Sequence, residues 1–134
     1  MAIERRIIVD HVAFVVTDLA ASTALYEQLL TPLGFTVLYR HSTGVGFGAD
    51  EIDDFALNEG TPGEPPTSAA HVAFAAESKA DVDAFHAAAV AAGLTDITPP
   101  RVRPEYSTRY YACFVRDLHG NNIEAVWHAS TPQV

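Results

Sequence analysis

The sequence has little from which to build a disulfide, a membrane span or a nucleic-acid surface. Cys113 is the single cysteine among 134 residues, so no intrachain disulfide and no cysteine-based zinc site is available. Lys and Arg number 8 against 17 Asp and Glu, and the net charge of −9 disfavours nucleic acid and anionic membranes as partners. No apolar run approaches the length of a membrane span, and the first residues lack a signal-peptide core. We therefore expect a cytoplasmic protein.

The tetrapeptide His-Val-Ala-Phe occurs twice, at residues 11–14 and 71–74. Each copy is followed by a helix-like stretch and then by a glycine, Gly34 in the first half and Gly93 in the second. A shared tetrapeptide with the same element and the same glycine behind it indicates an internal duplication. We predict one domain over residues 1–134, in which module 1 (about residues 7–58) and module 2 (about residues 70–128) are joined by a loop at residues 59–69.

Local patterns predict the order βαβββ in each module, and hence an α+β fold. In module 1 the expected elements are strands at residues 7–16, 35–40, 43–49 and 54–58 and a helix at residues 19–30. In module 2 they are a strand from residue 70, a helix between Ser78 and Gly93, strands at residues 95–98, 109–115 and 122–127, and a proline-rich loop at residues 99–106.

Alternation along the strands places a histidine on the same face in each module. Successive side chains of a strand point to opposite faces, so His11 shares a face with Ala13, and His71 shares one with Ala73. The bulkier residues on the other face are expected to pack under a helix. The small alanines leave room for a ligand beside each histidine.

Glu124 is a carboxylate with apolar neighbours in a strand that is expected to be largely buried. A buried carboxylate needs a cation or hydrogen bonds. With His11 and His71 it would form a facial triad, which leaves coordination positions open on a divalent metal. A single His or Glu in a strand is more often a structural residue, but the duplication favours two histidines that point into one cavity.

Several of these motifs together resemble the vicinal oxygen chelate superfamily. They are the two His-Val-Ala-Phe copies, Gly34-Phe35 after the first helix, and Asp-Leu-His-Gly-Asn-Asn-Ile-Glu at residues 117–124, and the resemblance covers about residues 7–128. The superfamily includes glyoxalase I, fosfomycin and bleomycin resistance proteins, extradiol dioxygenases and methylmalonyl-CoA epimerase. The resemblance implies two βαβββ modules that form a curved mixed sheet around a cavity. Because the superfamily hosts many reactions, it specifies the fold more firmly than the activity.

The resemblance also implies a ligand set and a dimer. The metal ligands would be His11, His71 and Glu124 around one divalent ion, with Fe²⁺, Mn²⁺, Ni²⁺ and Zn²⁺ as candidates. In single-domain members two chains usually pair, so we expect a homodimer in which His11 comes from one chain and the other two ligands from its partner. The sequence leaves open whether the triad is completed within one chain or between two.

A fourth ligand, a carboxylate on the fourth strand of the first module, is present in glyoxalase I. Aligning Phe47 with Phe114 without gaps places Leu57 opposite Glu124, and Phe55 has the same parity. Neither side chain binds metal, and Asp54 could reach the metal only if the register slips by one residue. The resemblance therefore implies a three-ligand site, as in the fosfomycin resistance enzymes and extradiol dioxygenases, and disfavours glyoxalase I activity.

Further polar residues are candidates for chemistry near the metal. Tyr111, Tyr106 and His128 could act as acid or base, and Tyr110 and Arg103 could bind the substrate, the arginine through an anionic group. The alternative for the tyrosines is packing in the core or an interface. The alternative for Arg103 is a solvated loop charge.

The leading hypothesis is a metal-dependent enzyme that acts on a small oxygen-bearing molecule chelated by the metal. Dioxygenase, lyase or isomerase, and thiol-transferase reactions are all compatible with it. The alternatives are a metal-free protein that sequesters a small molecule, as bleomycin resistance proteins do, and a structural remnant without turnover. An intact His/His/Glu set favours the enzyme.

Overall fold

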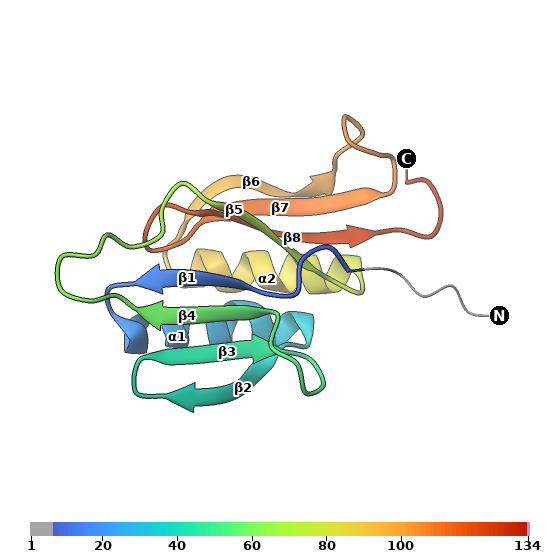
Figure 1. The fold of residues 1–134 in the computed structure, drawn as a ribbon. Helices are drawn as coiled ribbons and strands as arrows, with labels where there is room; N and C mark the ends of the chain where they lie inside the picture. Colours follow the sequence, from blue (N-terminus) through green and yellow to red (C-terminus); the bar gives the residue numbers. More distant parts are fainter. Residues whose placement is uncertain (1–6, 134) are drawn as a thin grey trace.

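The computed structural model describes residues 7–133 and repeats one arrangement of elements twice (Figure 1). Module 1 contains β1 (Val12–Val16), α1 (Leu19–Leu30), the 3-10 helix η1 (Thr31–Leu33), β2 (Thr36–His41), β3 (Gly44–Gly48) and β4 (Phe55–Glu59). Module 2 contains β5 (His71–Ala75), α2 (Lys79–Ala91), β6 (Thr95–Val102), β7 (Tyr110–Arg116) and β8 (Asn122–His128). The predicted α+β class and the βαβββ order of both modules are confirmed.

Each module forms its own four-stranded mixed sheet. The strand orders are β1-β4-β3-β2 and β5-β8-β7-β6, and in each sheet the first strand of the module pairs in parallel with the last. The two helices lie on the same side of the two sheets, behind the strands in Figure 1, and they contact each other. Within the described residues no helix is both long and apolar enough to span a membrane.

A single aromatic core joins the two modules. Phe14 and Phe74 end the two His-Val-Ala-Phe copies, and both pack edge-on against Phe55 with ring centroids 5.1 Å away. Tyr26 of α1 contacts Phe55 and Phe74, and so links a helix of module 1 to a strand of module 2. Burying one such ring contributes about 1.5–3 kcal/mol to stability. The large side chains therefore lie under the helices, as alternation predicts, and the histidine faces are left uncovered by them.

Two predicted elements differ from the structure. Strand β1 begins at Val12 and not at residue 7, because its ladder partner β4 begins only at Phe55. Strand β6 continues through Pro99 and Pro100, for which the sequence predicts a loop. It tolerates two residues without an N–H group because it is an edge strand, and its register with β7 shifts between Thr98 and Arg101.

The turn between β7 and β8 is held by a buried hydrogen-bond network. Tyr26 donates its hydroxyl hydrogen to Asp117 Oδ2 at 2.6 Å, and the Asn121 backbone N–H donates to Asp117 Oδ1 at 2.9 Å. The Asn121 amide also donates to the Thr67 carbonyl at 2.8 Å and accepts from the Ala70 N–H at 3.1 Å. The network thereby connects α1, the loop between the modules and the start of β8, and it fixes the strand that carries Glu124.

Asn121→Ala is expected to lower the free energy of unfolding by about 2–4 kcal/mol, because it leaves several buried polar groups without partners. Urea unfolding measures the change. Asn58→Ala, at an exposed position of β4, is the matched control and is expected to change stability by less than about 0.5 kcal/mol. Equal effects of the two substitutions would contradict the structural role of the network.

Cys113 is expected to be unreactive in the folded protein. Its side chain is fully buried on the helix side of β7, and burial raises the pKa of the thiol to about 12, so almost no thiolate is present near neutral pH. A thiol reagent should label the chain in denaturant and leave it unlabelled in native buffer. Rapid labelling of the native protein would show that this part of the core is open.

Candidate functional site

Most of the predicted site residues gather on one face of the module 2 sheet, the face directed away from α2. Strand pairing sets Phe114 beside Glu124 and Tyr110 beside His128, and paired residues of neighbouring strands share a face. His71 of β5 lies on the same side and contacts Glu124. We call the surface formed by these five residues the site face.

Glu124 is the centre of the site face and is only 2% exposed. Its Oε1 lies 2.7 Å from His71 Nε2, and its Oε2 accepts a hydrogen bond of 2.5 Å from the Tyr110 hydroxyl. A carboxylate only accepts hydrogen bonds, so both neighbours donate. This explains how the sheet tolerates a buried charge, and the half-exposed His71 ring forms the open side of the pair.

Tyr110 is flanked by two further candidates. The rings of Tyr106 and His128 pack edge-on against it, with centroids at 5.2 Å and 5.1 Å. Burial, and then the hydrogen bond and charge of Glu124, raise the pKa of Tyr110 above its usual value, so the phenol remains a donor at neutral pH. Tyr106 and His128 therefore contact Tyr110, which in turn contacts the Glu124 carboxylate.

Arg103 also reaches the site face, and it is not a solvated loop charge. Only 14% of its side chain is exposed, and its guanidinium lies 4.7 Å from the Phe114 ring centre and 5.3 Å from that of Tyr106. The Phe114 ring is also 5.9 Å from the His71 ring. Phe114 is a site residue that the sequence analysis does not single out, although its strand position relative to Tyr110 would have indicated it.

Tyr111 lies on the opposite face of β7 and does not join this group. Its hydroxyl donates to Asp83 Oδ1 of α2 at 2.6 Å, and the Lys79 ammonium lies 5.1 Å from its ring centre. Adjacent residues of a strand point to opposite sides, so Tyr111 faces the helix because Tyr110 faces Glu124. Tyr111, a predicted acid or base, therefore packs against α2 and lies away from the site face.

His11 lies in module 1, just before β1, with 61% of its side chain exposed. Its Nδ1 is 2.8 Å from Asp10 Oδ1, and this hydrogen bond raises the pKa of the imidazole. No group of three His, Cys, Asp or Glu side chains within residues 7–133 is close enough to hold a metal ion. One chain therefore brings His71 and Glu124 together but not His11.

The ladder register identifies the module 1 counterpart of Glu124. Ala73 pairs with Glu124 in module 2, and Ala13 pairs with Ala56 in module 1. The counterpart is therefore Ala56, whereas the ungapped alignment gave Leu57, a residue of the core. Ala56 has no ligand atom, and Asp54, two residues before it and of the same parity, lines a separate cavity.

The corresponding face of module 1 is occupied by aromatic rings. Gly46, the ladder partner of Ala56, has no space for a side chain because the Tyr39 ring lies against its Cα. Tyr39 in turn stacks on His41 with a centroid distance of 5.7 Å. Where module 2 presents Glu124 beside Phe114, module 1 presents Ala56 beside Gly46, with the Tyr39 ring against the glycine.

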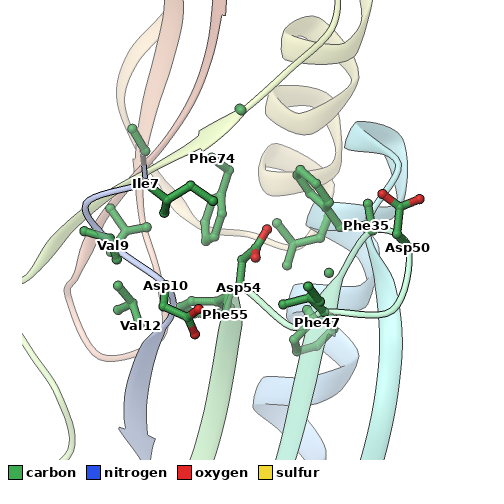
Figure 2. A pocket seen from close by; sticks show the side chains of 17 residues that line it. Ile7, Val9, Asp10, Val12, Phe35, Phe47, Asp50, Asp54, Phe55 and Phe74 are labelled. Atoms are coloured by element: carbon green, nitrogen blue, oxygen red, sulfur yellow. The ribbon is translucent and has the colours of Figure 1, made fainter. Parts of the chain in front are cut away.

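A separate cavity of about 630 Å³ opens between the modules near the start of β1 (Figure 2). Aromatic side chains such as Phe35, Phe47 and Phe74 line it, and Asp54 points into it in Figure 2. Neither His71 nor Glu124 reaches it, and its lining, all within the described residues, contains no histidine or cysteine. We therefore place the candidate chemistry on the site face and not in this cavity.

Glu124→Gln is expected to lower the pKa of Tyr110, because both the charge of the carboxylate and its hydrogen bond raise it. Tyrosinate absorbance as a function of pH measures the shift, and adding Tyr110→Phe in each background assigns it to this residue. A Tyr110 titration that Glu124→Gln leaves unchanged would contradict the hydrogen bond.

Comparison with known proteins agrees with this architecture. Residues 8–125 match the family model of the Glyoxalase/Bleomycin resistance protein/Dioxygenase superfamily, while no curated protein matches the chain. A glyoxalase/bleomycin resistance protein from Albidiferax ferrireducens T118 is 31% identical with a TM-score of 0.76, over 89% of this chain and 97% of that one.

Two other solved structures share the fold. Lactoylglutathione lyase from Agrobacterium tumefaciens is 19% identical with a TM-score of 0.65, over 92% of this chain and 96% of that one. The fosfomycin resistance protein FosX from Mesorhizobium loti is 24% identical with a TM-score of 0.61, over 90% and 91%. With its duplicated βαβββ modules and its match over residues 8–125, the chain belongs to the Glyoxalase/Bleomycin resistance protein/Dioxygenase superfamily.

Proposed function

We propose that this protein is a metal-dependent enzyme that acts on a small oxygen-bearing molecule at the site face. The contact between the buried Glu124 and the half-exposed His71 is the observation that carries the proposal. Two neighbouring ligands of one six-coordinate divalent ion, each about 2.0–2.2 Å from it, lie roughly 3 Å apart at right angles. The observed 2.7 Å between His71 Nε2 and Glu124 Oε1 would need to open by only a few tenths of an ångström.

His11 of a second chain is the third ligand in this proposal. Asp10 accepts a hydrogen bond from His11 Nδ1–H in this proposal, which leaves Nε2 available as a ligand. Carboxylates commonly orient metal-binding histidines in this way. The proposal therefore includes a homodimer in which module 1 of one chain faces module 2 of the other.

A divalent ion bound here, with Fe²⁺, Mn²⁺, Ni²⁺ and Zn²⁺ as candidates, would hold two substrate oxygens and stabilise negative charge that develops on them. Tyr110 orients Glu124 by holding its Oε2. Tyr106 and His128 flank Tyr110 and are the proposed sources of a proton donor or acceptor. Dioxygenase, lyase or isomerase, and thiol-transferase reactions are all compatible with this arrangement.

Metal-free binding of a small molecule is the second candidate, and one observation favours it. Both oxygens of Glu124 already have hydrogen-bond donors within the chain, so the carboxylate is stable without a cation. The rings of the exposed Tyr106 and the partly exposed Tyr110 would then form the surface on which a flat ligand packs. Bound metal distinguishes the two candidates.

Elemental mass spectrometry of the purified, untagged protein is the test. We expect about one divalent transition metal per chain, and its loss in His71→Ala and Glu124→Ala because each substitution removes a ligand. His86→Ala is the matched control, since His86 also contacts a carboxylate, Asp96 at 2.9 Å, away from the site face.

Metal retained by Glu124→Ala would contradict this ligand set. Absence of metal from the wild-type protein, even after anaerobic loading with iron, manganese, nickel and zinc, would overturn the enzyme proposal and leave metal-free binding. Circular dichroism of each variant confirms that loss of metal is not loss of fold.

A further inference from the structure

The guanidinium of Arg103 has a buried N–H group without a hydrogen-bond partner among the described residues. Its Nε donates to Glu105 Oε1 at 2.9 Å, but its Nη1 is buried and has no hydrogen-bond partner among the described residues. A buried donor of a charged group that lacks a partner is costly, and the cost is larger than for a neutral group. An anionic ligand atom at Nη1 would remove this cost.

Backbone pairing places the Arg103 side chain, and with it Nη1, beside the site face. Arg103 N–H donates to the Tyr110 carbonyl at 2.7 Å, which continues the β6–β7 pairing and places Arg103 on the same side as Tyr110. The guanidinium and the His71 ring both contact the Phe114 ring. Phe114 is itself only 5% exposed, so a small molecule bound over this group of side chains can reach Arg103 at one end and the half-exposed His71 at the other.

We propose that Arg103 binds a carboxylate of the substrate, so that this site takes a small, flat acid whose opposite end reaches His71 and Glu124. The inference rests on the proposed function for the identity of the site, and it names the class of substrate. Planar guanidinium and carboxylate groups match each other in shape and charge. The Phe114 and Tyr106 ring centres lie 4.7 and 5.3 Å from the guanidinium carbon, and the rings restrict its position.

The charges near Arg103 favour a carboxylate over a phosphate. Glu105, about half exposed, already compensates part of the positive charge. Arg101 is more exposed than Arg103, with 48% of its side chain accessible. Its Nη2 lies 3.6 Å from Glu105 Oε2. A singly charged group suits the remaining positive charge better than a doubly charged phosphate does.

The experiment compares benzoate with benzamide, which have the same ring and differ in charge. Isothermal titration measures both ligands on the protein as purified and again after dialysis against a chelator. We expect benzoate to bind more tightly than benzamide in both preparations. Arg103→Gln is expected to weaken benzoate roughly tenfold or more, as expected for loss of a charge-assisted hydrogen bond, and to leave benzamide unchanged.

Arg101→Gln is the matched control, because it removes the same charge two residues away at an exposed position. It should change benzoate affinity less than about twofold. Equal effects of Arg101→Gln and Arg103→Gln, no preference for benzoate, or no binding at millimolar benzoate would each overturn the proposal. So would stronger binding of inorganic phosphate than of benzoate at Arg103.

Failure of this proposal is distinguishable from failure of the proposed function. Benzoate binding that chelation abolishes would assign the carboxylate to a metal and not to Arg103, which overturns the inference and leaves the metal site intact. Arg103-dependent binding in a protein that never takes up metal would support the inference while the enzyme proposal falls. Metal content of Arg103→Gln should equal that of the wild type, since Arg103 is not among the proposed ligands.

Discussion

A buried carboxylate on the open face of a sheet is the constraint on which this structure depends. Glu124 is almost fully inaccessible, yet the side of the sheet on which it lies is not covered by a helix. Its two oxygens have hydrogen-bond partners on the two neighbouring strands, His71 on β5 and Tyr110 on β7. The Asp117–Asn121 network fixes the turn just before β8, so the geometry of the carboxylate is built into the core.

The two modules have kept one fold and diverged on their open faces. Their strand orders agree, and the two phenylalanines of the repeated tetrapeptide occupy matching places in the core. The ladder positions that hold Glu124 and Phe114 in module 2 hold Ala56 and Gly46 in module 1. Module 2 therefore carries the carboxylate, while module 1 offers an exposed histidine and a stacked aromatic surface. This division explains why one chain presents two ligands of the proposed set and not three.

The fold was largely predictable, because the repeat, the helix caps and strand alternation all act locally. Asp18 and Ser78 cap α1 and α2 as their positions indicate. The two prolines of β6 predict a loop from sequence, because only the sheet topology shows that β6 is an edge strand in which proline is tolerated.

The site was predicted less completely. His71 and Glu124 contact each other as expected. The faces to which Tyr111 and Leu57 point depend on strand register, because a shift of one residue moves a side chain to the opposite face. The burial of Arg103 depends on contacts between strands that no local pattern contains. In the proposal, His11 enters the site only from a second chain.

The central claim is that one site is assembled from two chains, and mixing two inactive variants tests it most directly. His11→Ala and Glu124→Ala each remove one ligand, so neither protein alone should hold metal. After the two are mixed and allowed to exchange chains, about a quarter of the wild-type metal content should return, as expected for one intact site in each mixed dimer. No recovery in demonstrably mixed dimers, or full metal content in His11→Ala alone, would contradict the account.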